Sequence, residues 1–312
     1  MKWVTAELHT HTCASDGNFT FEELVQSAKA EDLDVIAITD HNTIHPATHI
    51  RKLEKKYNID IIAGMEWTTF YGHLVILNLH SYIDWRTIGP SQFDVTDIKK
   101  SDAILGIAHP FRVGSPIATG CHWEYEVSDW NDIDYFEVWS NVNPNINAAN
   151  KKAFKFWLDK LNTTKLTAVY GRDWHRPIPA DKIVAKNYIG VIGDNMKSGV
   201  IDAIKAGRVV VSLAPLIEFT LFDNDHVVNI GEDYFTSNCI VNFKCVITQL
   251  NNIPSSLVIK SNLGPIHFAN ISQDSIIVSN ISITSVKWII AVIEQNTEMV
   301  AFTNPIFIRQ KE

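Results

Sequence analysis

The chain has 312 residues, of which 46% are hydrophobic and 20% are charged, and its mean hydropathy is −0.01. These values are typical of a folded globular protein, and they exclude a disordered, collagen-like or fibrous chain. The formal net charge of −8 argues against a broad basic surface that would hold an extended nucleic acid. A short oligonucleotide as a substrate is compatible with this charge.

The number of cysteines and the length of the apolar runs indicate the cellular compartment in which the protein is expected. Four scattered cysteines are too few for a disulfide framework, which favours a reducing compartment. The sequence has no apolar run as long as a signal peptide core or a membrane span. We therefore expect a cytoplasmic protein that does not bind membranes; the sequence does not indicate its oligomeric state.

Short apolar runs alternate with longer amphipathic segments from residue 4 to about residue 214, which predicts a parallel α/β fold there. A helix is predicted to begin at Thr20, whose hydroxyl can cap the first turn while Glu23 completes a capping box. Gly207 is predicted to end the last helix. The predicted strands are 4–11, 34–39, 59–63, 73–79, 104–108, 133–139 and 166–170, and the other predicted helices are 46–56, 147–161 and 200–206.

The composition changes after Pro215, where Ser, Thr, Asn, Ile and Val dominate and helical periodicity disappears. Apolar β-branched runs recur there at intervals of about ten residues, which predicts antiparallel strands. These predicted strands are 219–222, 240–248, 256–261, 275–284 and 288–294. We therefore predict an α/β domain over residues 1–214 and an antiparallel β-sandwich domain over residues 215–312.

Histidine is unevenly distributed, since ten of the twelve histidines precede residue 176. Groups of potential metal ligands recur where predicted strands end, and one further group enters a strand. In a β/α barrel the carboxyl ends of the strands open on one face, where active sites are built. Nitrogen and carboxylate ligands without thiolates suit zinc, manganese or iron. The groups are 8–11 with 15–17, 38–42, 64–66, 72–73, 106–110 and 170–175.

In their order along the chain, these motifs resemble those of the polymerase and histidinol phosphatase (PHP) superfamily. Two later segments, 203–215 and 303–306, resemble its carbaryl-hydrolase-like branch (CehA/McbA). The resemblance implies a distorted, seven-stranded, TIM-like β/α barrel that holds two or three divalent ions at its strand ends. The motifs that carry it are 9–12, 15–17, 39–41, 64–66, 109–110 and 171–175.

The resemblance also implies the ligands of each ion. Glu66 is implied to bridge two ions, and His80 is a substitute candidate for His73. The implied sets are His9, His11, Glu66 and Asp173 for the first ion, Glu66, His73 and His109 for the second, and Asp16, His41 and His175 for a third.

Four residues are candidates for catalytic roles. Glu66 and Asp173 would hold the ions at the reacting group. Asp40 is expected either to orient a ligand imidazole or to cap a helix. Arg172 is expected either to bind an anionic substrate group through two hydrogen bonds or to be solvated or ion-paired.

Three nearby residues have less specific expectations. Arg112 has the same two alternatives as Arg172. Glu137 is expected either to support a ligand or to form a simple salt bridge. Cys13 is expected to pack as a small hydrophobic side chain rather than to bind a metal.

The implied activity is metal-dependent hydrolysis, with a phosphate monoester or diester as the first expectation. Hydroxide formed from a water between the ions would be the nucleophile, because bound divalent ions lower the pKa of water toward neutrality. One alternative is a carbamate or aryl-ester hydrolase of the carbaryl-hydrolase type. Another is a metal-stabilised binding module without activity. We expect a small anionic, phosphorylated substrate.

Overall fold

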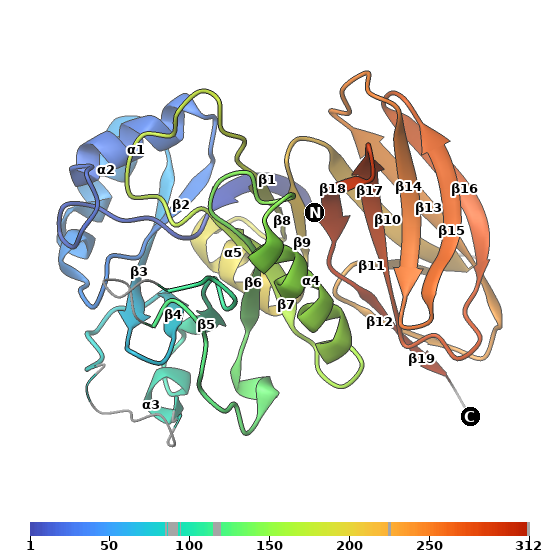
Figure 1. Cartoon of the computed structure of the whole chain (residues 1–312), viewed down its shortest axis with the longest axis horizontal. Helices are drawn as coiled ribbons and strands as arrows, with labels where there is room; N and C mark the ends of the chain where they lie inside the picture. The colour runs from blue at the N-terminus through green and yellow to red at the C-terminus, as the bar shows by residue number, and fades with distance from the viewer. Residues whose placement is uncertain (85, 87–92, 94, 115–119, 224–225, 311–312) are drawn as a thin grey trace.

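The computed structural model describes residues 1–84, 86, 93, 95–114, 120–223 and 226–310. Helices and strands are mixed in the first two thirds of the chain, whereas strands alone fill the last third (Figure 1). Within the described residues, no helix is long and apolar enough to cross a membrane. All four cysteines are free, as their spacing predicted.

The elements of the N-terminal region match most of the predicted ones. The strands are β1 (Lys2–Glu7), β2 (Val35–Ile38), β3 (Asp60–Thr68), β4 (His73–Leu77), β5 (Ile104–Ile107), β6 (Tyr135–Ser140), β7 (Thr167–Gly171), β8 (Lys186–Val191) and β9 (Val209–Ser212). The helices are α1 (Phe21–Ala30), α2 (Ile50–Tyr57), α3 (Thr96–Lys99), α4 (Ala148–Lys160) and α5 (Met196–Lys205), with short 3-10 segments η1 (His45–His49) and η3 (Trp130–Asp132). Strands β8 and β9 were not predicted.

Two groups of parallel strands, β1–β2–β3 and β5–β6–β7, are separated by β4. Strand β4 runs antiparallel to both of its neighbours, so the expectation of an all-parallel sheet was wrong at this strand. The connection from Thr68 to His73 is too short for the crossover that a parallel neighbour requires. The reversal places the start of β4 at the edge where the parallel strands end.

Local signals in the sequence fix the helix ends. The predicted capping box is present, with Thr20 Oγ1 accepting from the Glu23 backbone and Glu23 accepting from the Thr20 backbone. Gly207 follows α5 with a φ of +73°, a conformation that glycine adopts without strain. The buried face of α1 packs on β2 and β3 in a core that includes Leu24, Ile36 and Ile61.

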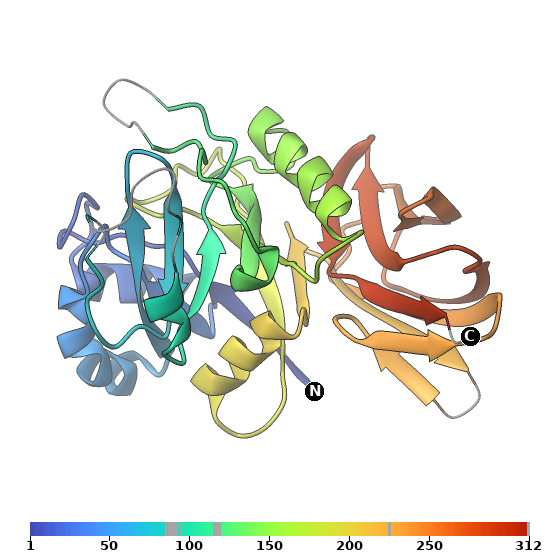
Figure 2. The same cartoon turned by 90° about the horizontal axis from the view of Figure 1, so that it is seen from below.

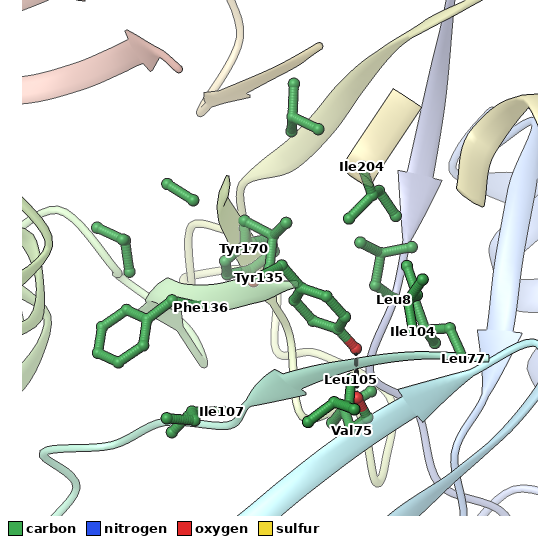
Figure 3. Packing of buried hydrophobic residues seen from close by; sticks show 14 of the residues in the cluster. Leu8, Val75, Leu77, Ile104, Leu105, Ile107, Tyr135, Phe136, Tyr170 and Ile204 are labelled. Atoms are coloured by element: carbon green, nitrogen blue, oxygen red, sulfur yellow. Dashed lines mark hydrogen bonds between the residues drawn. The ribbon is translucent and has the colours of Figure 1, made fainter. Parts of the chain in front are cut away.

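Buried side chains from neighbouring strands form the main core of this region (Figure 3). Leu8 lies just beyond β1, and Leu105, Tyr135 and Tyr170 come from β5, β6 and β7. The Tyr135 hydroxyl donates a hydrogen bond of 2.6 Å to the Val75 carbonyl oxygen, so its one polar atom is satisfied inside the core. This packing holds the strand ends that carry the motif residues in fixed relation to each other.

The C-terminal region consists of two layers of strands that share a second core (Figure 2). One layer has the order β11 (His226–Asn229), β10 (Leu216–Asp223), β13 (Ile240–Thr248), β16 (Ser275–Ser282). The other contains β12 (Asp233–Thr236), β14 (Ser255–Ser261), β15 (Gly264–Ile271), β17 (Trp288–Gln295), β18 (Glu298–Thr303) and β19 (Ile306–Gln310). Side chains such as Phe219, Phe243, Leu257 and Ile289 fill the space between the layers, which is the arrangement of a β-sandwich.

The two regions are joined by a continuous sheet. Strand β18 of the C-terminal region pairs with β9 of the N-terminal region, and β9 pairs with β8. The predicted boundary between residues 214 and 215 falls between β9 and β10. Main-chain hydrogen bonds therefore cross this boundary, and the division into two domains stays a prediction.

Two side-chain amides line the edge of β7 that faces β8 and β9. Asn187 of β8 accepts from the Tyr170 N–H (2.8 Å) and donates to the Tyr170 carbonyl (2.7 Å). Asn304, between β18 and β19, forms the same pair with Ala168 at 2.7 and 2.9 Å. We call these contacts the β7 seam. Closure of the sheet as a seven-stranded, TIM-like barrel stays a prediction.

Asn304→Leu is expected to lower the free energy of unfolding by about 3 kcal/mol. Asn304 is fully buried, and the substitution leaves the Ala168 N–H and carbonyl without partners, at a cost of about 1–3 kcal/mol for each buried group. Urea denaturation followed by circular dichroism would measure the change, with the exposed Asn270→Leu on β15 as the matched control. Equal stability of the two variants would contradict this role of the seam.

Candidate metal centre

All nine residues predicted as metal ligands meet at one edge of the N-terminal sheet, in a network of close contacts that we call the cluster. Most of them lie in or just beyond the carboxyl ends of parallel strands. The members of the cluster are His9 and His11 after β1, Asp16 in the following loop, His41 after β2, Glu66 in β3, His73 in β4, His109 after β5, and Asp173 and His175 after β7. Their function as ligands stays a prediction.

The direction of β4 explains how His73 reaches the cluster. Because β4 is antiparallel to β3, its first residue His73 lies opposite Thr68, close to the end of β3. The His73 Nδ1 atom is 2.9 Å from Glu66 Oε1, and the side chain is buried. His80 follows the other end of β4 and is exposed, so the structure brings His73, and not its substitute, to the cluster.

Glu66 occupies the middle of the cluster and is fully buried. Each of its oxygens faces imidazole nitrogens from different strands. The contacts are 3.2 Å to His9 Nε2, 3.3 Å to His11 Nε2 and 2.9 Å to His41 Nδ1 from Oε2, and 2.9 Å to His73 Nδ1 and 3.1 Å to His109 Nε2 from Oε1. A carboxylate with partners on both oxygens is suited to bridge two cations.

Two aspartates, Asp173 and Asp16, also contact histidines of the cluster. Asp173 Oδ1 lies 3.5 Å from His9 Nε2 and 3.2 Å from His11 Nε2. Asp16 Oδ1 lies 3.1 Å from His175 Nε2 and 3.5 Å from His41 Nε2. The Asp16 side chain is 60% exposed, whereas that of Asp173 is only 4% exposed, so the cluster opens to solvent on the Asp16 side.

Among the residues that the structure describes, donor atoms within 4.8 Å of one another form two groups. The grouping differs from the implied sets, because His11 joins the more exposed group, His109 joins His9 in the buried one, and His73 belongs to neither. The two groups are His9, Glu66, His109 and Asp173, and His11, Asp16, His41 and His175.

Unsatisfied buried atoms test whether the cluster fits metal ions. Five buried side-chain atoms of the cluster make no hydrogen bond of regular geometry with any described residue, although some of them face an opposite charge: His9 Nε2, His11 Nδ1 and Nε2, Glu66 Oε2 and His73 Nε2. Buried polar atoms nearly always have partners, and nitrogen and carboxylate donors are those that zinc, manganese and iron bind. The residues therefore fit divalent metal ions; the number and the identity of the ions stay predictions.

The pKa shifts within the cluster also support a site for divalent cations. Burial opposes the charge of Glu66, but the rings of His9, His41 and His73 hold the pKa of its carboxyl group well below the usual range. Burial would likewise lower the pKa of His9, yet the carboxylates of Glu137 and Glu66 raise it well above its ordinary value. The pKa values of His41, His109 and His175 are raised as well, whereas burial lowers those of His11 and His73. Divalent cations would compete with protons for these nitrogen ligands.

Glu137, a residue of β6, orients two of the candidate ligands, His9 and His109. Its Oε1 accepts a hydrogen bond of 2.7 Å from His9 Nδ1, and its Oε2 accepts one of 2.8 Å from the His109 backbone N–H. These bonds turn His9 Nε2 toward the cluster, as expected for a residue that supports a ligand. Gly171 makes room for the carboxylate, since a Cβ at this position would lie 1.9 Å from Glu137 Oε1.

Glu7, the last residue of β1, was missed by the sequence analysis. Its Oε1 accepts from the backbone N–H groups of Leu8, His9 and Arg172 at 3.0, 3.0 and 2.9 Å. Burial raises the pKa of Glu7 to about 7, against the opposing charge of Arg172. Glu7 thus joins the backbone that precedes His9 to the backbone that precedes Asp173. The signal in the sequence was a single carboxylate at the end of an apolar strand.

The structure supports the ion-paired alternative for Arg172 over substrate binding. Arg172 is only 1% exposed, and its guanidinium carbon lies 4.1 Å from the centre of the Trp174 ring. Its Nη1 is 2.8 Å from Glu31 Oε2, and its Nε is 3.3 Å from Glu7 Oε2. Arg112 is the arginine that reaches the cluster, where its Nη1 pairs with Asp173 Oδ2.

Asp40 has neither of the roles predicted for it. Its carboxylate accepts hydrogen bonds from the Thr12 N–H (2.8 Å), the Thr12 hydroxyl (2.8 Å) and the Ser15 hydroxyl (2.6 Å). Asp40 therefore shapes the turn that carries Asp16, and it does so without contacting a ligand ring. The expectation for Cys13 was also wrong, because this residue of the same turn is exposed.

A cavity of about 680 Å³ adjoins the exposed side of the cluster. Asp16, Asp173 and His175 form its inner wall. Arg112, Arg176 and Lys182 also line it, and Arg172 belongs to its wall although the Arg172 side chain is buried. The cavity therefore joins the candidate ligands to positively charged groups, although the chain as a whole is acidic.

The fold and the cluster define a mixed α/β protein with a candidate site for divalent metal ions. Comparison with known families identifies the first part of the chain: residues 7–100 match the PHP domain family. This span holds His9, His11, Asp16, His41, Glu66 and His73. The match confirms the predicted resemblance to PHP proteins over this span.

Curated relatives match parts of the chain. An uncharacterized protein of Methanocaldococcus jannaschii is 29% identical over 161 residues, which cover 48% of this chain and 91% of the relative. A phosphoribosyl 1,2-cyclic phosphate 1,2-diphosphodiesterase of Eggerthella lenta is 30% identical over 64 residues. This second alignment covers 20% of the chain and only 24% of the relative.

One solved structure resembles the chain over both regions. It is a two-domain protein of Bacteroides vulgatus that is described as containing a predicted PHP-like metal-dependent phosphoesterase. The two structures superpose with a TM-score of 0.53 and 15% sequence identity, over 98% of this chain and 95% of the other. At this identity the likeness shows a shared fold, with the α/β region followed by the β-rich region.

Proposed function

We propose that the chain is a metal-dependent hydrolase and that its substrates are phosphate esters. The observation that carries this proposal is the cluster itself, in which buried nitrogen and oxygen donors without hydrogen-bond partners adjoin a cavity lined by cations. The match of residues 7–100 to the PHP domain supports the same class. The Eggerthella lenta relative, named as a diphosphodiesterase, favours a phosphoester over a carbonyl substrate.

Different residues of the chain would have different roles in the hydrolysis. Zinc, manganese or iron ions bound to the cluster would lower the pKa of water and polarise the ester group. Glu66 and Asp173 would hold these ions, and Glu137 and Glu7 keep the ligand rings and their backbone in place. Arg112 at the edge of the cavity would neutralise charge that develops on the phosphoryl oxygens.

None of the residues in the segments that resemble the carbaryl-hydrolase-like branch lines this cavity. The first includes β9, and the second includes Asn304, which is part of the β7 seam. The hydrogen bonds of these residues stabilise the fold, so a structural role explains their presence. Carbamate or aryl-ester hydrolysis is therefore the second outcome to test, and metal-stabilised binding without activity is the third.

A small set of substrates separates these outcomes. The purified protein would be stripped of metal, reloaded with zinc, manganese or iron, and assayed on p-nitrophenyl phosphate, bis-p-nitrophenyl phosphate and a naphthyl carbamate. We expect metal-dependent release of nitrophenol from at least one phosphate ester, with the stripped protein as the control. Turnover of the carbamate alone would overturn the phosphoesterase proposal, and no turnover with any metal would favour the binding module.

A further inference from the structure

The geometry points to a second anion-binding position in the cavity, formed by Arg176 with Lys182. The substrate would then be an organic phosphate ester that carries a second phosphate or carboxylate. This inference rests on the proposed function, because it assigns the reacting phosphoryl group to the cluster and the second anion to a second wall of the cavity. That wall is the segment 176–182, which follows the candidate ligand His175 directly.

The wall is held in a fixed position. Pro177 and Pro179 restrict its backbone, and the Lys182 N–H donates to the Pro179 carbonyl at 3.0 Å. At its far end, the Asn143 N–H donates to the Ile183 carbonyl at 2.7 Å, and the Asn143 side chain accepts from the Ile183 N–H at 2.9 Å. A preorganised wall binds a ligand without a large cost of ordering the chain.

The cations of the cavity differ in their availability. Arg112 is paired with Asp173, and Arg172 is buried between two glutamates. Lys182 forms an ion pair of 2.7 Å with Asp181, but both side chains are substantially exposed, and such pairs contribute little stability. Arg176 has no ion-pair or hydrogen-bond partner among the described residues of the chain. Arg176 is therefore the cation that is ready to bind an anion.

Apolar residues also line the cavity. Val142, Pro177, Ile178 and Pro179 line the cavity alongside the charged groups. Apolar side chains in a pocket can contact the organic part of a ligand while the polar groups fix its orientation. Arginine binds phosphate or carboxylate through two parallel hydrogen bonds. Together, these features fit a substrate with an anion at each end of an organic body.

Binding of non-hydrolysable phosphonates tests this inference without relying on turnover. Isothermal titration of the metal-loaded protein would compare phenylphosphonate with two para-substituted forms, one bearing a carboxylate and the other a carboxyethyl group. We expect at least one carboxylated form to bind about tenfold more tightly than phenylphosphonate, as for one added charged hydrogen-bond pair.

Variants then assign the effect to Arg176. Arg176→Ala is expected to remove the preference while leaving the affinity for phenylphosphonate unchanged, and Arg176→Lys is expected to keep part of it. Arg51→Ala, which removes an exposed arginine of α2, is the matched control. Loss of the preference in Arg176→Ala but not in the control would support the inference.

The remaining outcomes separate this inference from the proposed function. Equal affinity for all three phosphonates, or a preference that survives Arg176→Ala, would overturn the second position. Hydrolysis of phenyl phosphate, measured in parallel, tests the proposed function alone. A preference that depends on Arg176 without any hydrolysis would support the second position and contradict the phosphoesterase. A protein that binds none of the phosphonates would contradict both.

Discussion

Glu66→Gln is expected to remove metal binding and to lower the rate of phosphate ester hydrolysis by at least about a thousandfold, or about 4 kcal/mol. Both Glu66 oxygens face imidazoles, and the side chain is fully buried in the middle of the cluster. Glutamine keeps the size of the side chain but replaces one oxygen by an amide nitrogen, which cannot bind a cation, and it removes the negative charge.

Metal content and kinetics measure this effect together. Inductively coupled plasma spectrometry after dialysis would give the ions bound per chain, and initial rates would give kcat/KM. Glu126→Gln is the matched control, because this carboxylate is exposed and lies outside the cluster. Wild-type metal content in Glu66→Gln, with an unchanged circular dichroism spectrum, would contradict the assignment of Glu66 as the bridging ligand.

Gly171→Ala is expected to weaken metal binding by about 10–100-fold, although residue 171 cannot itself bind a metal through its side chain. The new methyl group would lie 1.9 Å from Glu137 Oε1 and 2.4 Å from its Cδ, so the carboxylate has to move. Glu137 would then lose its hydrogen bonds to the His9 ring and to the His109 backbone. Loss of a group that orients metal ligands typically costs this much affinity.

A double-mutant cycle shows whether the effect passes through Glu137. Competition with a metal indicator would give the affinities of Gly171→Ala, Glu137→Ala and the double variant. Because the methyl group acts by displacing the Glu137 carboxylate, the double variant should bind metal about as well as Glu137→Ala alone. Additive losses would show instead that Gly171→Ala distorts β7 in another way.

The sequence predicts those parts of the fold that depend on local signals. The capping box at Thr20 and the glycine that ends α5 are satisfied within a few residues, so both follow from the sequence. The direction of β4 and the presence of β8 depend on which strands become neighbours, and this is decided by packing far along the chain. Asn187 shows the same limit, because its role appears only when Tyr170 lies beside it.

For the site, the metal-ligand types were predictable and Glu137 was expected as a possible support, whereas the roles of Glu7 and Asp40 were not predicted. Histidines and carboxylates at strand ends are recognisable by spacing, and the structure brings all nine candidates together. Glu7 and Asp40 act through backbone and hydroxyl groups, which every sequence contains, so no pattern distinguishes them. Arg172 and Arg112 are both near ligand positions in the sequence, and only the three-dimensional structure separates the buried ion pair from the residue at the cavity.

The β7 seam has a consequence for how the chain is made. Ala168 finds its partner Asn304 136 residues later in the sequence, so this half of the seam cannot form until the ribosome has synthesised residue 304. Contacts this distant slow folding, because a long loop must close before they form. Until then the N–H and carbonyl groups of Ala168 lack this partner, and another unfinished chain can pair with this edge of β7 and aggregate. We therefore expect chaperone demand during synthesis to concentrate on β7.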